Sequence, residues 1–153
     1  LYQTGSPAAQ SIAVSHATEG EFRFITAYPW SSSGFGTRFA NPATLPTGIG
    51  LGVAFSSRGD AIAVAHSSSP FITAYPWSGS GFGTKFANPT TLPVARGNGV
   101  AFSPSGDAIA VSHFNSPFIT AYPWSSSGFG TRFANPATLP EGSGYGVDFT
   151  FNP

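Results

Sequence analysis

The stretch Ile119–Pro140, which reads ITAYPWSSSGFGTRFANPATLP, decides the fold because the chain contains it three times with almost no change. Ile25–Pro46 is the same string letter for letter, and Ile72–Pro93 differs from it at three positions. Tryptophans therefore recur every 47 residues, at Trp30, Trp77 and Trp124. A fixed period of this length is the signature of a repeat architecture, in which each copy is one supersecondary unit.

One copy of the repeat is expected to contain four short β-strands. In the third copy, large apolar residues alternate with small ones, which is the period-two pattern of a strand. Gly106 can supply the positive φ of a tight hairpin, whereas Pro123 lacks an N–H and predicts a frayed, bulged or unpaired strand end. No stretch has the 3.6-residue period of a helix. The expected strands are Gly99–Ser103, Ala108–His113, Phe118–Trp124 and Thr131–Ala134.

Four short strands in a repeat of ~40–50 residues are typical of a β-propeller blade. A β-solenoid is the alternative, but its rungs are usually shorter, near ~20–30 residues. The predicted fold class is therefore all-β, a propeller of four-stranded antiparallel blades with about three blades per chain. The blades are expected at approximately residues 1–50, 51–97 and 98–144, followed by an orphan first strand at 145–153.

Two motifs resemble the WD40-like β-propeller repeat. Ala101–Asp107, AFSPSGD, is similar to the first strand and hairpin of that family, and Pro76-Trp77 stands where its Trp-Asp pair ends the third strand. The repeats depart from the family because the Gly-His pair is absent and a serine follows each tryptophan, so the family's side-chain network is not implied. Near-identical copies also resemble repetitive propellers of phages and environmental bacteria, which implies a virion-surface protein as one alternative.

Three blades are too few to close a propeller, which usually has 4–8. An open set exposes apolar faces on both end blades and predicts association, with two chains making about six blades or three making about nine. Residues 1–10 lack the pattern of a first strand, whereas Gly146–Phe151 is a first strand without a blade. The orphan strand is expected to complete the deficient blade of another copy. The alternative is that the chain, which begins at Leu1, is a piece of a longer or processed protein.

Composition excludes several classes of protein. Six basic residues balance six acidic ones without a basic run, which argues against binding to nucleic acid. The chain has no cysteine, and this excludes disulfides, thiolate metal sites and a cysteine nucleophile. No apolar run approaches the ~18 residues of a membrane span. Secretion, a virion surface and the cytoplasm all stay open as locations.

The titratable residues indicate structural roles rather than chemistry. His16, His66 and His113 occupy equivalent positions, where a repeated hydrogen bond is the simpler interpretation and a metal site or pH switch the alternative. Asp60 and Asp107 lie in hairpins, where they are expected to accept backbone N–H bonds. No patterned pair of carboxylates supports acid–base catalysis. We therefore expect no enzyme activity, no metal and no cofactor.

The repeated aromatic residues are the best candidates for a ligand site. Each copy places them beside a Ser/Gly loop, and an exposed aromatic ring near small polar groups can stack on a sugar. Packing between blades is the simpler interpretation; buried tryptophans favour a scaffold and exposed ones a ligand platform. The predicted function is a non-catalytic scaffold or interaction module, and the alternative is a lectin-like binder with one site per blade. The candidate residues are Trp30, Trp77, Trp124, Phe35, Phe82 and Phe129.

Overall fold

The computed structural model describes residues 9–17 and 24–151 of the chain. In these ranges the regular structure consists of short β-strands and includes no helix. The strands are β1 (Gln10–Ser15), β2 (Ile25–Ser31), β3 (Gly34–Phe35), β4 (Gly50–Phe55), β5 (Ala61–His66), β6 (Ile72–Ser78), β7 (Gly81–Phe82), β8 (Gly97–Phe102), β9 (Ala108–His113), β10 (Ile119–Ser125) and β11 (Gly128–Phe129).

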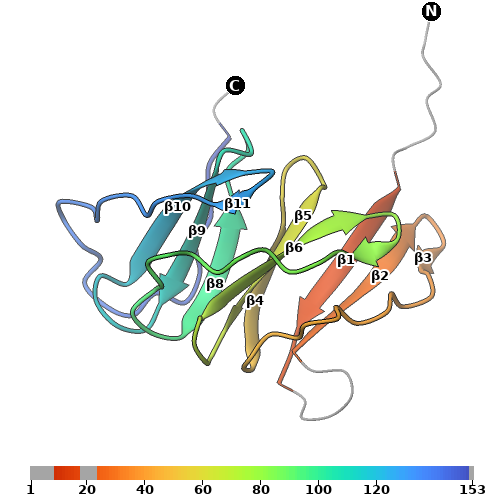
Figure 1. Ribbon diagram of the computed structural model, residues 1–153, viewed down its shortest axis with the longest axis horizontal. Coiled ribbons are helices and arrows are strands. Elements are labelled where there is room, and N and C mark those ends of the chain that lie inside the picture. Colours follow the sequence, from red (N-terminus) through yellow and green to blue (C-terminus); the bar gives the residue numbers. More distant parts are fainter. Residues whose placement is uncertain (1–8, 18–23, 152–153) are drawn as a thin grey trace, which may run out of the picture.

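The strands form three antiparallel sheets that follow the repeat. Their orders are β1-β2-β3, β4-β5-β6-β7 and β8-β9-β10-β11, so each sheet is a meander of neighbours in the chain. The first and third sheets lie at opposite ends of the molecule with the second between them (Figure 1). This arrangement confirms the predicted all-β class. Two sheets have the predicted four strands, and the first has three among the described residues.

The outer strand of each sheet is not the one that the sequence predicted. The expected strand Thr131–Ala134 is wrong, because β11 lies earlier and pairs Phe129 with Trp124. Gly128 has a φ of 96° and turns the chain tightly enough for a two-residue strand. Phe133 still donates its N–H to the carbonyl of Ala121 at 2.9 Å, but it forms no ladder.

Pro123 does not fray the third strand, contrary to expectation. It stays in register opposite Ala108 of β9, and the next residue, Trp124, donates its N–H to the carbonyl of Asp107 at 2.7 Å. Because successive residues of a strand point their backbone groups to opposite sides, the missing N–H of Pro123 faces away from β9. On that side Pro123 only accepts a bond, from the N–H of Gly130 at 2.8 Å.

The core consists of the contacts between neighbouring sheets. Each sheet has one face of small residues and one face of large ones, since the two sizes alternate along its strands. At the second junction, β5 and β6 supply the small face, chiefly Ala61, Ala63, Ala65 and Ala74, and β8–β10 supply the large one, chiefly Val100, Phe102, Ile109, Val111, Tyr122 and Trp124. The first junction packs Ile62, Val64 and Tyr75 against Ile25 in the same way.

Candidate functional site

Aromatic clusters lie at both junctions between sheets. Trp77 is surrounded edge-to-face by Phe39, Phe55 and Phe82, with ring centroids 4.9, 5.1 and 5.0 Å away. Trp124 has the equivalent neighbours Phe86, Phe102 and Phe129, each at 5.1 Å. Such T-shaped pairs are favourable because the positive edge of one ring meets the negative face of the other. In each cluster one phenylalanine, Phe39 or Phe86, comes from the preceding repeat.

The same cluster is incomplete at the two ends of the molecule. Among the described residues, Trp30 has a ring contact only with Phe35, at 5.0 Å, and its side chain is 39% exposed, against 7% for Trp124. Phe133 is the third member of the series that contains Phe39 and Phe86, and it is 50% exposed. The first sheet therefore presents a tryptophan without its phenylalanine, and the third presents a phenylalanine without its tryptophan.

The structure brings the predicted ligand residues together in pairs, one pair per sheet: Trp30 with Phe35, Trp77 with Phe82, and Trp124 with Phe129. Their exposure is unequal, because Trp124 is buried, Trp77 is half-buried and Trp30 is exposed. In the neighbouring loop, Ser127 donates its backbone N–H to Oγ of Ser125 at 3.2 Å. Packing between blades and glycan binding both stay predictions for these rings.

Two buried tyrosines form a second repeated contact, which sequence reasoning missed. The hydroxyl of Tyr75 donates to the carbonyl oxygen of Thr44 at 2.6 Å, and that of Tyr122 donates to Thr91 at 2.6 Å. Both side chains are fully buried, and burial raises the pKa of both phenols. Each acceptor lies in the preceding repeat, so the bond ties one repeat to the next. The signal in the sequence was the 47-residue spacing of these tyrosines.

On the third sheet, the surface equivalent to the one that Tyr122 covers on the second sheet is open. A cavity of about 110 Å³ lies there between Ile119–Ala121 and Phe133–Pro136. The equivalent residues of the second sheet, including Ile72 and Ala74, pack in the same cluster as the ring of Tyr122. The third sheet therefore ends in a preformed hollow that matches a buried contact elsewhere in the chain.

The histidines hold neighbouring strands together. Nε2 lies 2.9 Å from Thr26 Oγ1 in His16, 2.8 Å from Thr73 Oγ1 in His66 and 2.9 Å from Thr120 Oγ1 in His113. Desolvation by burial lowers the pKa of His66 to about 4 and also lowers the pKa of His113. Within the described ranges, no three histidine, cysteine or acidic side chains gather where they could hold a metal ion.

The hairpin aspartates bond differently from expectation. Ser103 Oγ accepts the backbone N–H groups of Asp107 at 3.1 Å and Ala108 at 3.0 Å, and it donates to Asp107 Oδ1 at 2.9 Å. The serine therefore caps the turn, and the carboxylate holds the serine in place. Hydrogen bonds from Ser105 and Ser103 lower the pKa of the Asp107 carboxyl. The same serine bonds recur at Ser56 and Asp60.

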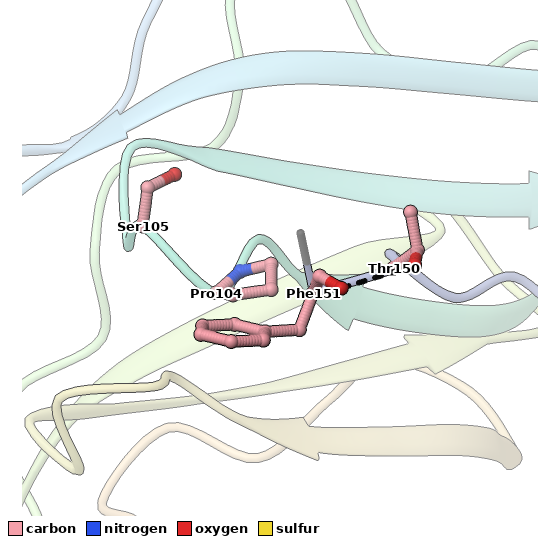
Figure 2. Close-up of a pocket in the computed structure, with 4 residues that line it drawn as sticks. All are labelled: Pro104, Ser105, Thr150 and Phe151. Carbon is pink, nitrogen blue, oxygen red and sulfur yellow. Dashed lines mark hydrogen bonds between the residues drawn. The ribbon is translucent and has the colours of Figure 1, made fainter. Parts of the chain in front are cut away.

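Another hollow, of about 300 Å³, lies where the C-terminal segment meets the hairpin of the third sheet. Figure 2 shows the Phe151 ring beside Pro104, with Ser105 and Thr150 completing the lining. The hydroxyl of Thr150 donates to the carbonyl of Phe151 at 3.5 Å and is directed along its own segment. This hollow brings together no charged side chains and defines no chemistry.

Comparisons with known proteins show the fold but no family. No family model and no curated protein matches the chain. A protein from Lactobacillus plantarum, known from a crystal structure, is similar with a TM-score of 0.60 and 14% identity, over 82% of this chain and 36% of that one. Its fold is propeller-like, and the chain is accordingly a β-propeller-type protein that spans about a third of that protein's length. In the part of the chain that the structure describes, no helix is long and apolar enough to cross a membrane.

Proposed function

We propose that this chain is a non-catalytic β-propeller scaffold whose copies associate head to tail into a closed ring. The observation that carries the proposal is the interrupted aromatic series. Phe39 meets Trp77 at 4.9 Å and Phe86 meets Trp124 at 5.1 Å, whereas Phe133 and Trp30 are exposed at opposite ends. Phe133 of one copy and Trp30 of the next complete the series by the contact already made twice within the chain.

The rest of the two end faces supports the same association. Ile12 and Val14 of β1 are 39% and 48% exposed, although Ile62 and Val64, their equivalents in β5, are fully buried. Burying a large aliphatic side chain contributes ~1.5–3 kcal/mol, so the exposed face favours a partner. One end shows the large face and the other the small face, so like ends do not match. Contacts between two different surfaces form a closed ring when the rotations from copy to copy add up to a full turn. Here the ring would have about six blades from two copies or nine from three.

The scaffold is preferred to the other candidate functions. One glycan site per blade requires equivalent exposure in each copy, but Trp30 is exposed and Trp124 is buried. The exposure follows position in the chain, as packing between blades requires. A place on a virion surface rests only on the resemblance of the repeats. Asp60 and Asp107 bond to hairpin serines, which gives no support to a catalytic role for these two acids.

Light scattering or native mass spectrometry tests the proposal. The expected mass is a discrete multiple of 15.8 kDa, and Trp30→Ser combined with Phe133→Ser should shift the protein to 15.8 kDa at the same concentration. Phe114→Ser is the matched control, because Phe114 is an exposed phenylalanine that packs against Arg96 outside the series. A wild-type protein that stays at 15.8 kDa over a wide range of concentrations would overturn the proposal.

A further inference from the structure

Strand β1 has an open edge. It is the equivalent of β5, because Ile12 pairs with Tyr28 as Ile62 pairs with Tyr75. Strand β5 is bonded on both sides, by β4 and β6, whereas β1 pairs only with β2 among the described strands. Among the described residues, the outer N–H and C=O groups of β1 therefore face no neighbouring strand, and an edge of this kind accepts an added strand.

The C-terminal segment, residues 144–151, follows the path of the innermost strand of a sheet but belongs to no sheet itself. Gly144 donates its N–H to the carbonyl of His113 at 3.0 Å, as Gly50, the start of β4, donates to His16 at 3.1 Å. A Cβ on Gly144 would lie 2.6 Å from the carbonyl oxygen of Phe118, and one on Gly50 would meet the carbonyl oxygen of Phe24. Only glycine fits at this crossing, so the two segments make the same close approach.

The segment also lies beside β8 as β8 lies beside β4. A Cβ on Gly52 of β4 would come within 2.9 Å of Gly99 Cα in β8, and a Cβ on Gly99 would come within 3.0 Å of Gly146 Cα. Asn98 of β8 adds a bond from Nδ2 to the carbonyl oxygen of Gly144 at 2.6 Å. Residues 144–151 are thus held where a fourth blade would begin, yet they join no sheet.

We infer that Gly146–Phe149 of one copy adds as an antiparallel strand to β1 of the next copy and completes its first sheet. This inference rests on the proposed head-to-tail association and names the segment that each copy contributes. The register follows from the chain itself, since Val53 pairs with Val64 and Phe55 with Ile62. By the same offset, Val147 lies opposite Val14 of the next copy, and Phe149 lies opposite Ile12.

The occupant is a second copy and not the same chain. Strand β1 belongs to the first sheet and the C-terminal segment packs on the third, at the other end of the molecule (Figure 1). The side chains also match, because the exposed Val14 and Ile12 gain apolar neighbours of the kind that cover Val64 and Ile62. The added strand thus continues a pairing that the chain already makes twice, between β4 and β5 and between β8 and β9.

Engineered disulfides test the register, because the chain contains no cysteine of its own. Opposed residues of antiparallel strands have Cα atoms ~4.5–5.5 Å apart, within the range that a disulfide spans. The double variant Val14→Cys/Val147→Cys should therefore form covalently linked copies under mild oxidation. The matched control Val14→Cys/Asp148→Cys moves one cysteine to the opposite face of the strand and should link at least tenfold less. Equal linking in both, or a linkage confined within single chains, overturns the inference.

Removal of residues 144–153 supplies a second readout that needs no oxidation. The shortened chain keeps Trp30 and Phe133, and its association should weaken at least tenfold in analytical ultracentrifugation. A synthetic peptide of residues 144–153 should bind the shortened chain, and the same peptide with Val147→Asp should not. Undiminished association of the shortened chain overturns the strand addition and leaves the proposed scaffold intact. A monomeric wild type overturns both, so the two failures are distinguishable.

Discussion

Acidification should destabilise the chain through His66, a fully buried imidazole that links β5 to β6. Desolvation lowers its pKa from the ordinary 6.5 to about 4. Between these values the unfolded chain binds a proton that the folded chain does not, so stability rises with pH in this window. The stability is complete above pH ~6.5 and is lost as the pH falls towards ~4. The total loss is ~3 kcal/mol, of which ~2 kcal/mol is already lost at pH 5.

Urea unfolding followed by tryptophan fluorescence measures this loss at pH 7.5 and pH 5, at one protein concentration. His66→Gln removes the titrating group, so its free energy of unfolding should fall by ~2 kcal/mol less than the wild type over the same interval. His16→Gln is the matched control, since it removes the equivalent bond to Thr26 but keeps His66. Because His66 is intact in this control, the ~2 kcal/mol loss assigned to His66 should remain.

Two results would refute this reasoning. If the wild type and His66→Gln lose the same free energy between pH 7.5 and pH 5, then His66 does not carry the titration. If His66→Gln is too unstable to measure, an NMR titration of the wild type decides the point instead. An imidazole signal of His66 that titrates near pH 6.5 would show that burial does not lower its pKa.

Three further substitutions separate stability within the chain from association between chains. Tyr122→Phe leaves the carbonyl of Thr91 without its donor and should lower the free energy of unfolding by ~1–2 kcal/mol in urea titrations. Tyr28→Phe removes the equivalent hydroxyl from the first sheet, at the open end. It should leave the free energy of unfolding unchanged and weaken association between chains. Equal destabilisation by Tyr28→Phe and Tyr122→Phe would contradict a role of these hydroxyls in joining one repeat to the next. Asp148→Ala should strengthen association several-fold in ultracentrifugation, since Ala101 holds the equivalent position in β8. Weaker association would contradict the proposed register between Gly146–Phe149 and β1.

The periodicity of the sequence predicted most of the fold and little of the site. Strand β9 has the predicted bounds, Ala108–His113, and Gly106 has the expected positive φ of 75°. The outer strand Gly128–Phe129 was missed because two residues carry no period, and the strand exists only through its pairing with β10. The open edge of β1 was expected from residues 1–10, which lack the pattern of a first strand, and not from the residues of β1, since an edge is defined by the neighbours that a strand lacks.

The identical strings Ile25–Pro46 and Ile119–Pro140 separate what the sequence determined from what the tertiary structure decided. Sequence alone determined the local structure, because the same residues form the same hairpin in both copies, β2 with β3 and β10 with β11. Only the tertiary structure decided the environment, since Trp124 is 7% exposed and Trp30 is 39% exposed. The physical reason is that dihedral preferences and turns act within a few residues, whereas burial depends on whether another sheet lies alongside.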